Sequence, residues 1–286
     1  MATIKHKQKR KTLIQLGQSH FAWAVVPLVV VTAVGAGSLM TRHSYAATPV
    51  VSAFPVGAWN LDENPILPNS QVADTYGLSP GQTPTNWSGS SVASLSGSGT
   101  GAYYFPGWQN RIGAKSVDAT ASSFSIANDN RFNPETKDFS VSLWVKALDP
   151  SSLVQSGVIK KSDTLNIIQK GLSGTGLQQW KVSVNATGKF ICTFRGPDAA
   201  GTIYNYEVPT KIYPFNVARK VTCSLSAGTI YASVQTGTVI DNYSGAGPIG
   251  GIRNTSPINV GKKTDSNHIE DTFAGVLDDI VISKGP

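Results

Sequence analysis

The stretch from Phe139 to Lys146 constrains the fold more than any other part of the chain. It reads Phe-Ser-Val-Ser-Leu-Trp-Val-Lys, so apolar residues alternate with polar ones except at Trp144, which falls on the polar side. A period of two places successive side chains on opposite faces, which is the pattern of a β-strand. Because Trp144 lies on the polar face, we expect that face to be covered at mid-strand and this tryptophan to belong to the core, as in a central strand of a sandwich.

Short alternating segments bounded by turn residues recur along the rest of the chain. Residues 180–184 and 190–194 flank a gap that contains Asn and Gly, and residues 221–225 and 229–234 flank Ser-Ala-Gly, so each pair predicts a β-hairpin. Beyond the first 46 residues, no apolar pattern of period 3.6 persists for the dozen residues that a helix needs. The sequence therefore predicts an all-β fold with two antiparallel sheets packed as a sandwich.

The first 46 residues carry a targeting signal. A basic segment that ends at Lys11 precedes an apolar run over 21–40, and small residues follow at Ser44 and Ala46, the positions that a signal peptidase inspects. We expect cleavage after Ala46, which divides the chain into a signal peptide (1–46) and a folded domain (47–286). The alternative is an uncleaved anchor helix, because about 20 apolar residues can just span a bilayer. Either way we expect the domain to be extracellular or at the cell surface. A membrane contact is expected only through the N-terminal segment, and only if that segment stays uncleaved.

The net charge of +7 does not belong to the domain. Six basic residues and no acidic one precede Ala47; removing those six from the chain's 24 basic residues leaves 18 against 17 acidic residues. A near-neutral domain offers no basic field to phosphates, so we expect no nucleic-acid partner.

The chain's two cysteines, Cys192 and Cys223, both lie in the exported part. Each is flanked two residues away on both sides by apolar residues, so both are expected to face inward. In an oxidising compartment an even pair favours a disulfide, which would contribute on the order of 3 to 4 kcal/mol. Two buried free thiols are the alternative.

Several segments in succession resemble the laminin-G-like branch of the concanavalin A-like lectin/glucanase jelly rolls. The opening 57–63 (GAWNLDE) is similar to the family's first strand and 138–146 (DFSVSLWVK) to its central strand. Residues 168–171 (IQKG) follow at the usual place, and 275–282 (GVLDDIVI) is similar to the closing strand. The cysteine-bearing strands resemble a disulfide-bearing subgroup of secreted bacterial members. Ala218-Arg219 departs from the family, which usually has Trp-His there. The resemblance spans about 56–283 and implies a jelly-roll sandwich whose members commonly bind glycans or surface proteins.

The resemblance also implies a structural calcium ion. In this superfamily a calcium often ties the first strand to the closing one through the Asp that starts the final strand, which corresponds to Asp278 here, with Asp62 or nearby carbonyls opposite. Calcium takes about six to eight oxygen ligands, many of them carbonyls. The alternative is that Asp278 and Asp279 cap the adjoining loop by hydrogen bonds.

Catalytic patterns are missing from the domain. His6, His20 and His43 lie in the leader, which leaves His268 alone and excludes a histidine zinc cluster. The glucanase relatives place carboxylates at Glu-x-Asp-x-x-Glu, and none of the chain's four glutamates stands in that pattern. We therefore expect a chain that is not an enzyme, with a polysaccharide-active hydrolase or lyase of the same fold as the alternative.

Loop aromatic and polar residues are the candidate ligand contacts. Sugar rings stack on exposed aromatic faces, which points to Trp87, Trp108 and Tyr104, and a polar loop offers Asp129 and Asn130 as hydrogen-bond partners for hydroxyls. Packing and turn formation are the competing roles for these residues. We expect a recognition module that binds carbohydrate or a surface protein; a structural envelope protein without a ligand is a further alternative.

Overall fold

The computed structural model describes residues 53–63, 66–97, 99–110, 122–174, 177–263 and 271–286. The predicted leader, 1–46, lies outside these ranges, as does His268. The described residues belong to one compact unit. Within the described ranges, no helix has both the length and the apolar character to cross a bilayer.

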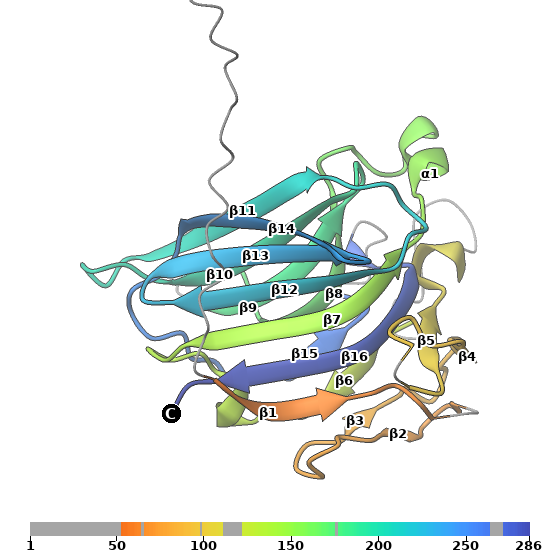
Figure 1. Ribbon diagram of the computed structural model, residues 1–286, viewed down its shortest axis with the longest axis horizontal. Coiled ribbons are helices and arrows are strands. Elements are labelled where there is room, and N and C mark those ends of the chain that lie inside the picture. Colours follow the sequence, from red (N-terminus) through yellow and green to blue (C-terminus); the bar gives the residue numbers. More distant parts are fainter. Residues whose placement is uncertain (1–52, 64–65, 98, 111–121, 175–176, 264–270) are drawn as a thin grey trace, which may run out of the picture. The chain divides into compact units, whose positions relative to one another are not determined.

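The described residues form two eight-stranded antiparallel sheets (Figure 1). The first sheet has the order β14-β13-β12-β7-β16-β5-β4, with β1 added to β16. Its strands are β1 (Phe54–Trp59), β4 (Ser90–Val92), β5 (Ala102–Phe105), β7 (Phe139–Ala147), β12 (Arg219–Ser226), β13 (Thr229–Thr236), β14 (Val239–Ala246) and β16 (Gly275–Lys284). The predicted strand around Phe139–Lys146 is confirmed as a central strand, β7, between β12 and β16.

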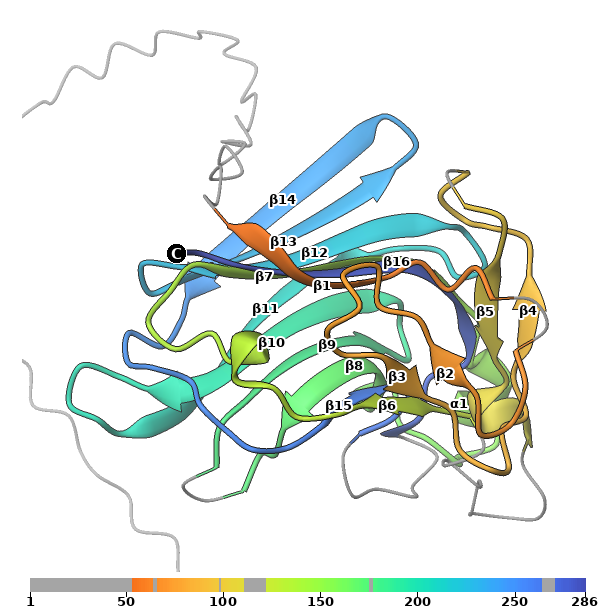
Figure 2. The ribbon, with the colours of Figure 1, turned by 90° about the horizontal axis from the view of Figure 1, so that it is seen from below.

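The second sheet has the order β11-β10-β9-β8-β15-β6-β3-β2 and lies in a layer against the first (Figure 2). Its strands are β2 (Gln71–Val72), β3 (Gly81–Gln82), β6 (Phe124–Ile126), β8 (Thr164–Gly171), β9 (Gln179–Asn185), β10 (Lys189–Pro197), β11 (Ile203–Ile212) and β15 (Ile258–Val260). The helical segments of the described chain are short: η1 (Gly107–Asn110), η2 (Asn130–Phe132) and α1 (Ser151–Gln155). The predicted all-β, two-sheet antiparallel sandwich is therefore confirmed.

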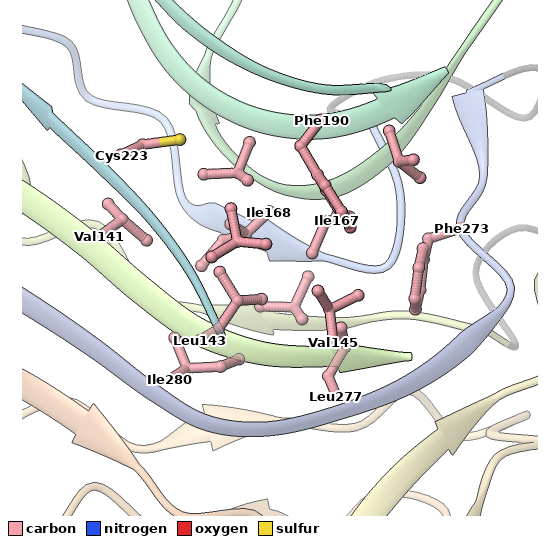
Figure 3. Packing of buried hydrophobic residues seen from close by; sticks show 14 of the residues in the cluster. Val141, Leu143, Val145, Ile167, Ile168, Phe190, Cys223, Phe273, Leu277 and Ile280 are labelled. Atoms are coloured by element: carbon pink, nitrogen blue, oxygen red, sulfur yellow. The ribbon is translucent and has the colours of Figure 1, made fainter. Parts of the chain in front are cut away.

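The core fills the space between the two sheets (Figure 3). Val141, Leu143 and Val145 of β7 point from the first sheet toward Ile168 of β8 and Phe190 of β10 on the second. The apolar residues of β7 alternate with polar ones because one face of the strand is buried in the core. Burying one aliphatic side chain stabilises the fold by about 1.5 to 3 kcal/mol.

A disulfide between Cys192 of β10 and Cys223 of β12 joins the two sheets inside this core, with 5.5 Å between the two Cα atoms. Both cysteines are buried. The preference for a disulfide over two thiols is confirmed.

The tryptophans of the strands divide between core and surface. Trp59 and Trp180 are buried, and their indole N–H groups donate to the carbonyl oxygens of Ser79 and Phe132 at 3.1 and 2.8 Å. Trp144 is only half-buried, on the outer face of the first sheet. Its expected place in the core is wrong, because the alternation of β7 turns it away from the second sheet.

Candidate functional site

A row of polar side chains crosses the whole outer face of the second sheet. Direct cross-strand partners project on the same side of a sheet, and Thr193 follows Cys192, which points into the core. Starting from Thr193, the cross-strand pairs therefore identify one outward-facing residue on each of the eight strands. In spatial order the members of this polar row are Gln71, Gln82, Ser125, Asn259, Gln169, Lys181, Thr193 and Glu207.

The middle of the polar row is shielded from solvent and its ends are exposed. Gln169 and Thr193 are buried, whereas Gln82 and Glu207 are exposed. The Gln169 amide receives a hydrogen bond from Asn166 at 2.6 Å and donates to Gln179 Oε1 at 3.1 Å. The centre of the face is thus held by a network of side-chain amides.

Two hydroxyl groups at this centre lack a hydrogen-bond partner among the described residues. They belong to Thr193 and to Ser183, which lies on the same face one row away. Native proteins pair nearly all buried polar groups with protein or water. These hydroxyls therefore mark positions with unused hydrogen-bonding capacity.

Charged residues gather around Lys181 in the middle of the polar row. Burial lowers the pKa of Lys181, and the charge of Lys263 lowers it further, while the charges of Glu207 and Asp271 oppose the shift. Lys263 and Asp271 form an ion pair at 3.5 Å and a backbone hydrogen bond at 3.0 Å. Ammonium and carboxylate groups thus lie near each other on this face of the sheet.

One end of the polar row opens into a hollow of about 190 Å³. Gln82, Ser125 and Asn259 belong to both the row and the hollow. The hollow is lined by Gln82, Thr83, Pro84, Ser123, Phe124, Ser125, Asn259 and Lys262. This is smaller than the roughly 300–1,000 Å³ of pockets for drug-sized ligands. It suits a small ligand group with several hydrogen-bonding positions and one apolar side.

The two predicted calcium ligands, Asp62 and Asp278, both accept hydrogen bonds from the loops beside them. The buried Asp278 accepts hydrogen bonds at its Oδ2 atom from Ser94 Oγ (2.7 Å) and from the amides of Leu95 (2.7 Å) and Ser96 (3.1 Å). Asp62 Oδ1 accepts from two further backbone amides, those of residues 100 and 101, at 2.7 and 2.8 Å. Asp278 Oδ1 is buried without a hydrogen-bond partner in the described part of the chain.

Both carboxylates are thus engaged by hydrogen-bond donors of the adjoining loops. A calcium ion would need about six to eight oxygen ligands, carbonyl oxygens among them. No group of three or more His, Cys, Asp or Glu side chains that could hold a metal occurs among the described residues. The observed contacts match the alternative of loop capping; calcium binding itself stays a prediction.

The predicted aromatic contacts lie mainly in the core. Trp87 and Trp108 are 6% and 8% exposed, and the Trp87 ring packs edge-on against Phe105 at 5.5 Å between centroids. Neither ring offers a free face to a ligand, because the loops that carry them fold back over the sandwich. Tyr104 is half-buried on β5, where its hydroxyl contacts Gln109 Oε1.

Asp129 and Asn130 belong to a capped turn that contributes nothing to the polar row. Asp129 caps η2 by accepting the Arg131 amide at 2.8 Å and forms an ion pair with the Arg131 guanidinium at 2.7 Å. Hydrogen bonding from Arg131 holds the pKa of Asp129 below its usual range. Asn130 is the exposed first residue of η2.

Sequence reasoning missed the polar row. Its signal was present as the polar member of each alternating pair, such as Lys181 between Trp180 and Val182. The eight members come from eight strands, so only the strand order brings them together.

Comparisons with known proteins give a fold and no family. No family model matches the chain, and no curated protein matches it significantly. Domain 4 of AbnA, a GH43 extracellular arabinanase from Geobacillus stearothermophilus, solved in complex with arabinotriose, is similar with 13% identity and a TM-score of 0.51. This match covers 82% of this chain and 94% of that domain. The two-sheet β-sandwich of this chain is therefore similar in fold to that arabinanase domain.

Two further structures are similar at lower scores. The enzymatically active domain of bacteriophage CBA120 tailspike protein 2 has 12% identity and a TM-score of 0.44, covering 70% of this chain and 28% of that chain. Domains LG4-5 of the mouse laminin alpha1 chain have 10% identity and a TM-score of 0.40, covering 63% and 40%. This chain therefore spans well under half the length of both.

The prediction that the chain is not an enzyme is contradicted by these comparisons, because the similar domain 4 of AbnA comes from an extracellular arabinanase. At 13% identity this likeness shows the fold and assigns no reaction. Catalytic turnover is therefore a property to be measured on this chain.

Proposed function

We propose that this chain is an exported β-sandwich protein that interacts with carbohydrate, and that the glycan binds at the hollow on the polar row. The observation that carries the proposal is the set of side chains at that hollow. Gln82, Ser125 and Asn259 present amide and hydroxyl groups on neighbouring strands, next to the apolar ring of Pro84.

This combination matches the chemistry of a sugar. Sugar hydroxyls both donate and accept hydrogen bonds, as amides and hydroxyls do, and the C–H face of a pyranose or furanose ring packs on apolar side chains. The continuation of the polar row beyond Asn259 gives an extended glycan further polar contacts. The arabinotriose in the similar arabinanase domain makes arabino-oligosaccharides the first ligands to test.

Export and family membership are parts of the same proposal. The Cys192–Cys223 disulfide is typical of proteins from oxidising compartments, which supports an extracellular or cell-surface location. The resemblance to laminin-G-like jelly rolls, and to their disulfide-bearing secreted subgroup, supports glycan or surface-protein recognition as the role. A protein partner would be the second kind of ligand for the same face.

The test is a glycan array on the full chain, with arabino-oligosaccharides included, run with calcium and again with a chelator. We expect binding of a defined glycan class. Each glycan that binds is then incubated with the protein and assayed for cleavage, so that binding and turnover are distinguished. A folded protein that binds no glycan in either condition would overturn the proposal.

A pair of matched variants localises the binding. Gln82→Ala removes an amide from the hollow, and losing one hydrogen bond of about 0.5 to 1.5 kcal/mol lowers affinity roughly two- to thirteenfold. Gln235→Ala removes the same group from the outer face of the first sheet, where Gln235 donates to the carbonyl of Gly237 at 2.9 Å. Gln235→Ala is expected to bind like the wild type.

A further inference from the structure

Lys170, the penultimate residue of β8, is a fully buried lysine surrounded by oxygen atoms. Gln169 lies on the outer face, so Lys170 points to the core side, opposite Trp180 of β9. Four acceptor oxygens lie within hydrogen-bond distance of its Nζ atom, which has three donors when charged: Asn128 Oδ1 at 2.8 Å, the Asn254 carbonyl at 3.0 Å, Asn254 Oδ1 at 2.9 Å and the Ser256 carbonyl at 2.9 Å.

None of these four partners is a carboxylate. The negative charge that acts on Lys170 is that of Asp129, whose own carboxylate is ion-paired with Arg131 at 2.7 Å. Burial lowers the pKa of Lys170 to about 8, so the neutral amine is accessible near physiological pH. A desolvated, neutral lysine amine is a nucleophile, as in lysines that form covalent intermediates.

The side-chain amide of Asn254 lies against this amine in a fixed orientation. Its Oδ1 atom accepts hydrogen bonds both from Lys170 Nζ and from the backbone amide of Ser256, at 2.9 and 3.1 Å. Its Nδ2 atom donates to the carbonyl of Gln178 at 3.3 Å, which holds the other side of the amide. A backbone N–H that donates to a carbonyl oxygen also stabilises the negative charge that develops there when a nucleophile adds to the carbon.

We propose that Lys170 and Asn254 form an intramolecular isopeptide bond in the folded protein. The Nζ–Cγ bond forms and the Cγ–Nδ2 bond breaks. One proton passes from the amine to the departing nitrogen, and ammonia leaves. The reaction is a transamidation in which nothing is oxidised or reduced, so the folded chain supplies both reactants.

The fold supplies the proximity that such a reaction needs. Two groups held in contact react as if each were at a very high effective concentration, which replaces an enzyme that would bring them together. The residues are 84 positions apart in sequence. The bond would therefore tie β8 to the segment between β14 and β15 and close a much larger ring than the disulfide, whose cysteines are 31 positions apart.

Of the two asparagines at Nζ, the structure favours Asn254 as the electrophile. Asn128 is exposed to water, whereas Asn254 is half-buried and has hydrogen bonds on both its oxygen and its nitrogen. The preference makes Asn128→Ala a matched control, because it removes the other amide and leaves the proposed bond possible.

The test is the intact mass of the purified full chain after reduction of its disulfide, followed by tryptic peptide mapping. We expect the mass to be lower than that of the sequence by one ammonia. Trypsin does not cleave at a modified lysine, so residues 162–181 are expected as one peptide joined to residues 254–262. Lys170→Arg keeps a hydrogen-bonding cation but cannot form the bond, and its full mass is expected to return. Asn128→Ala is expected to retain the deficit.

Three outcomes would overturn the proposal. These are a wild-type chain of full mass, an ammonia loss confined to an unlinked peptide that contains Asn254, and a cross-link from Lys170 to Asn128. The wild-type mass decides the matter even if the Lys170→Arg chain fails to fold, and neither readout depends on glycan binding.

Discussion

Opening the Cys192–Cys223 disulfide is expected to lower the free energy of unfolding by about 4 kcal/mol. The two cysteines are 31 positions apart. The chain-entropy model assigns a ring of that size about 12 cal/mol/K of unfolded-state entropy, which is about 4 kcal/mol at room temperature. The bond also joins β10 to β12 through the core, so its loss leaves side-chain packing alone to hold the two sheets together there.

The assay is equilibrium unfolding in urea of the oxidised chain, the reduced chain and the Cys192→Ala/Cys223→Ala double variant. The reduced chain keeps both sulfur atoms in the core and therefore isolates the effect of ring closure. The double variant also loses buried sulfur, which is expected to cost roughly 1 kcal/mol more per site. A reduced chain within about 1 kcal/mol of the oxidised one would refute the reasoning from ring size.

Three further perturbations test the fold. Leu143→Ala is expected to lower the free energy of unfolding by about 2 to 5 kcal/mol, since the side chain is fully buried, and Ser142→Ala on the outer face serves as its control in urea unfolding. Asp278→Ala leaves three donors without their acceptor and is expected to cost more than 2 kcal/mol by the same measurement. Arg131 holds the pKa of the Asp129 carboxyl below its usual value, so the Asp129–Arg131 pair stabilises the fold fully above a pH of about 4. This stabilisation is lost as the pH falls through the lowered pKa. The urea midpoint is expected to fall in that acidic range, and to fall less steeply in Asp129→Asn.

Each of these expectations has a contradicting result. Equal loss in Leu143→Ala and Ser142→Ala would mean that β7 does not bury the face assigned to it. An Asp278→Ala chain as stable as the wild type would show that the hydrogen bonds to residues 94–96 do not stabilise the loop. An acid titration of Asp129→Asn that parallels the wild type would remove the Asp129–Arg131 pair as a cause of acid sensitivity.

The fold class could be predicted from the sequence because apolar residues alternate in the strands whose inner face is buried. The alternation of β7 identified a central strand, and the apolar neighbours of Cys192 and Cys223 placed both cysteines inward. The edge strands β11 and β14 were not predicted, because an edge strand needs no continuous apolar face. β11 also contains Pro209, which removes a ladder donor and weakens a strand signal.

The candidate site was less predictable than the fold. Tryptophans near turns suggested exposed stacking faces, but a large apolar ring gains more from burial, and Trp87 folded back onto Phe105. The polar row depends on strand order: Gln82 and Asn259 are separated by most of the domain in sequence and become neighbours only through β6. A local pattern carries no information about such pairing.

The most direct test of glycan binding at the hollow is a chemical-shift titration of the full chain with the glycan that the array identifies. The side-chain amide signals of Gln82 and Asn259 are the reporters, and that of Gln235 on the other sheet is the internal control. The account predicts saturable shifts at Gln82 and Asn259, with Gln235 unchanged. Shifts that cluster on the outer face of the first sheet and leave Gln82 and Asn259 unmoved would contradict it.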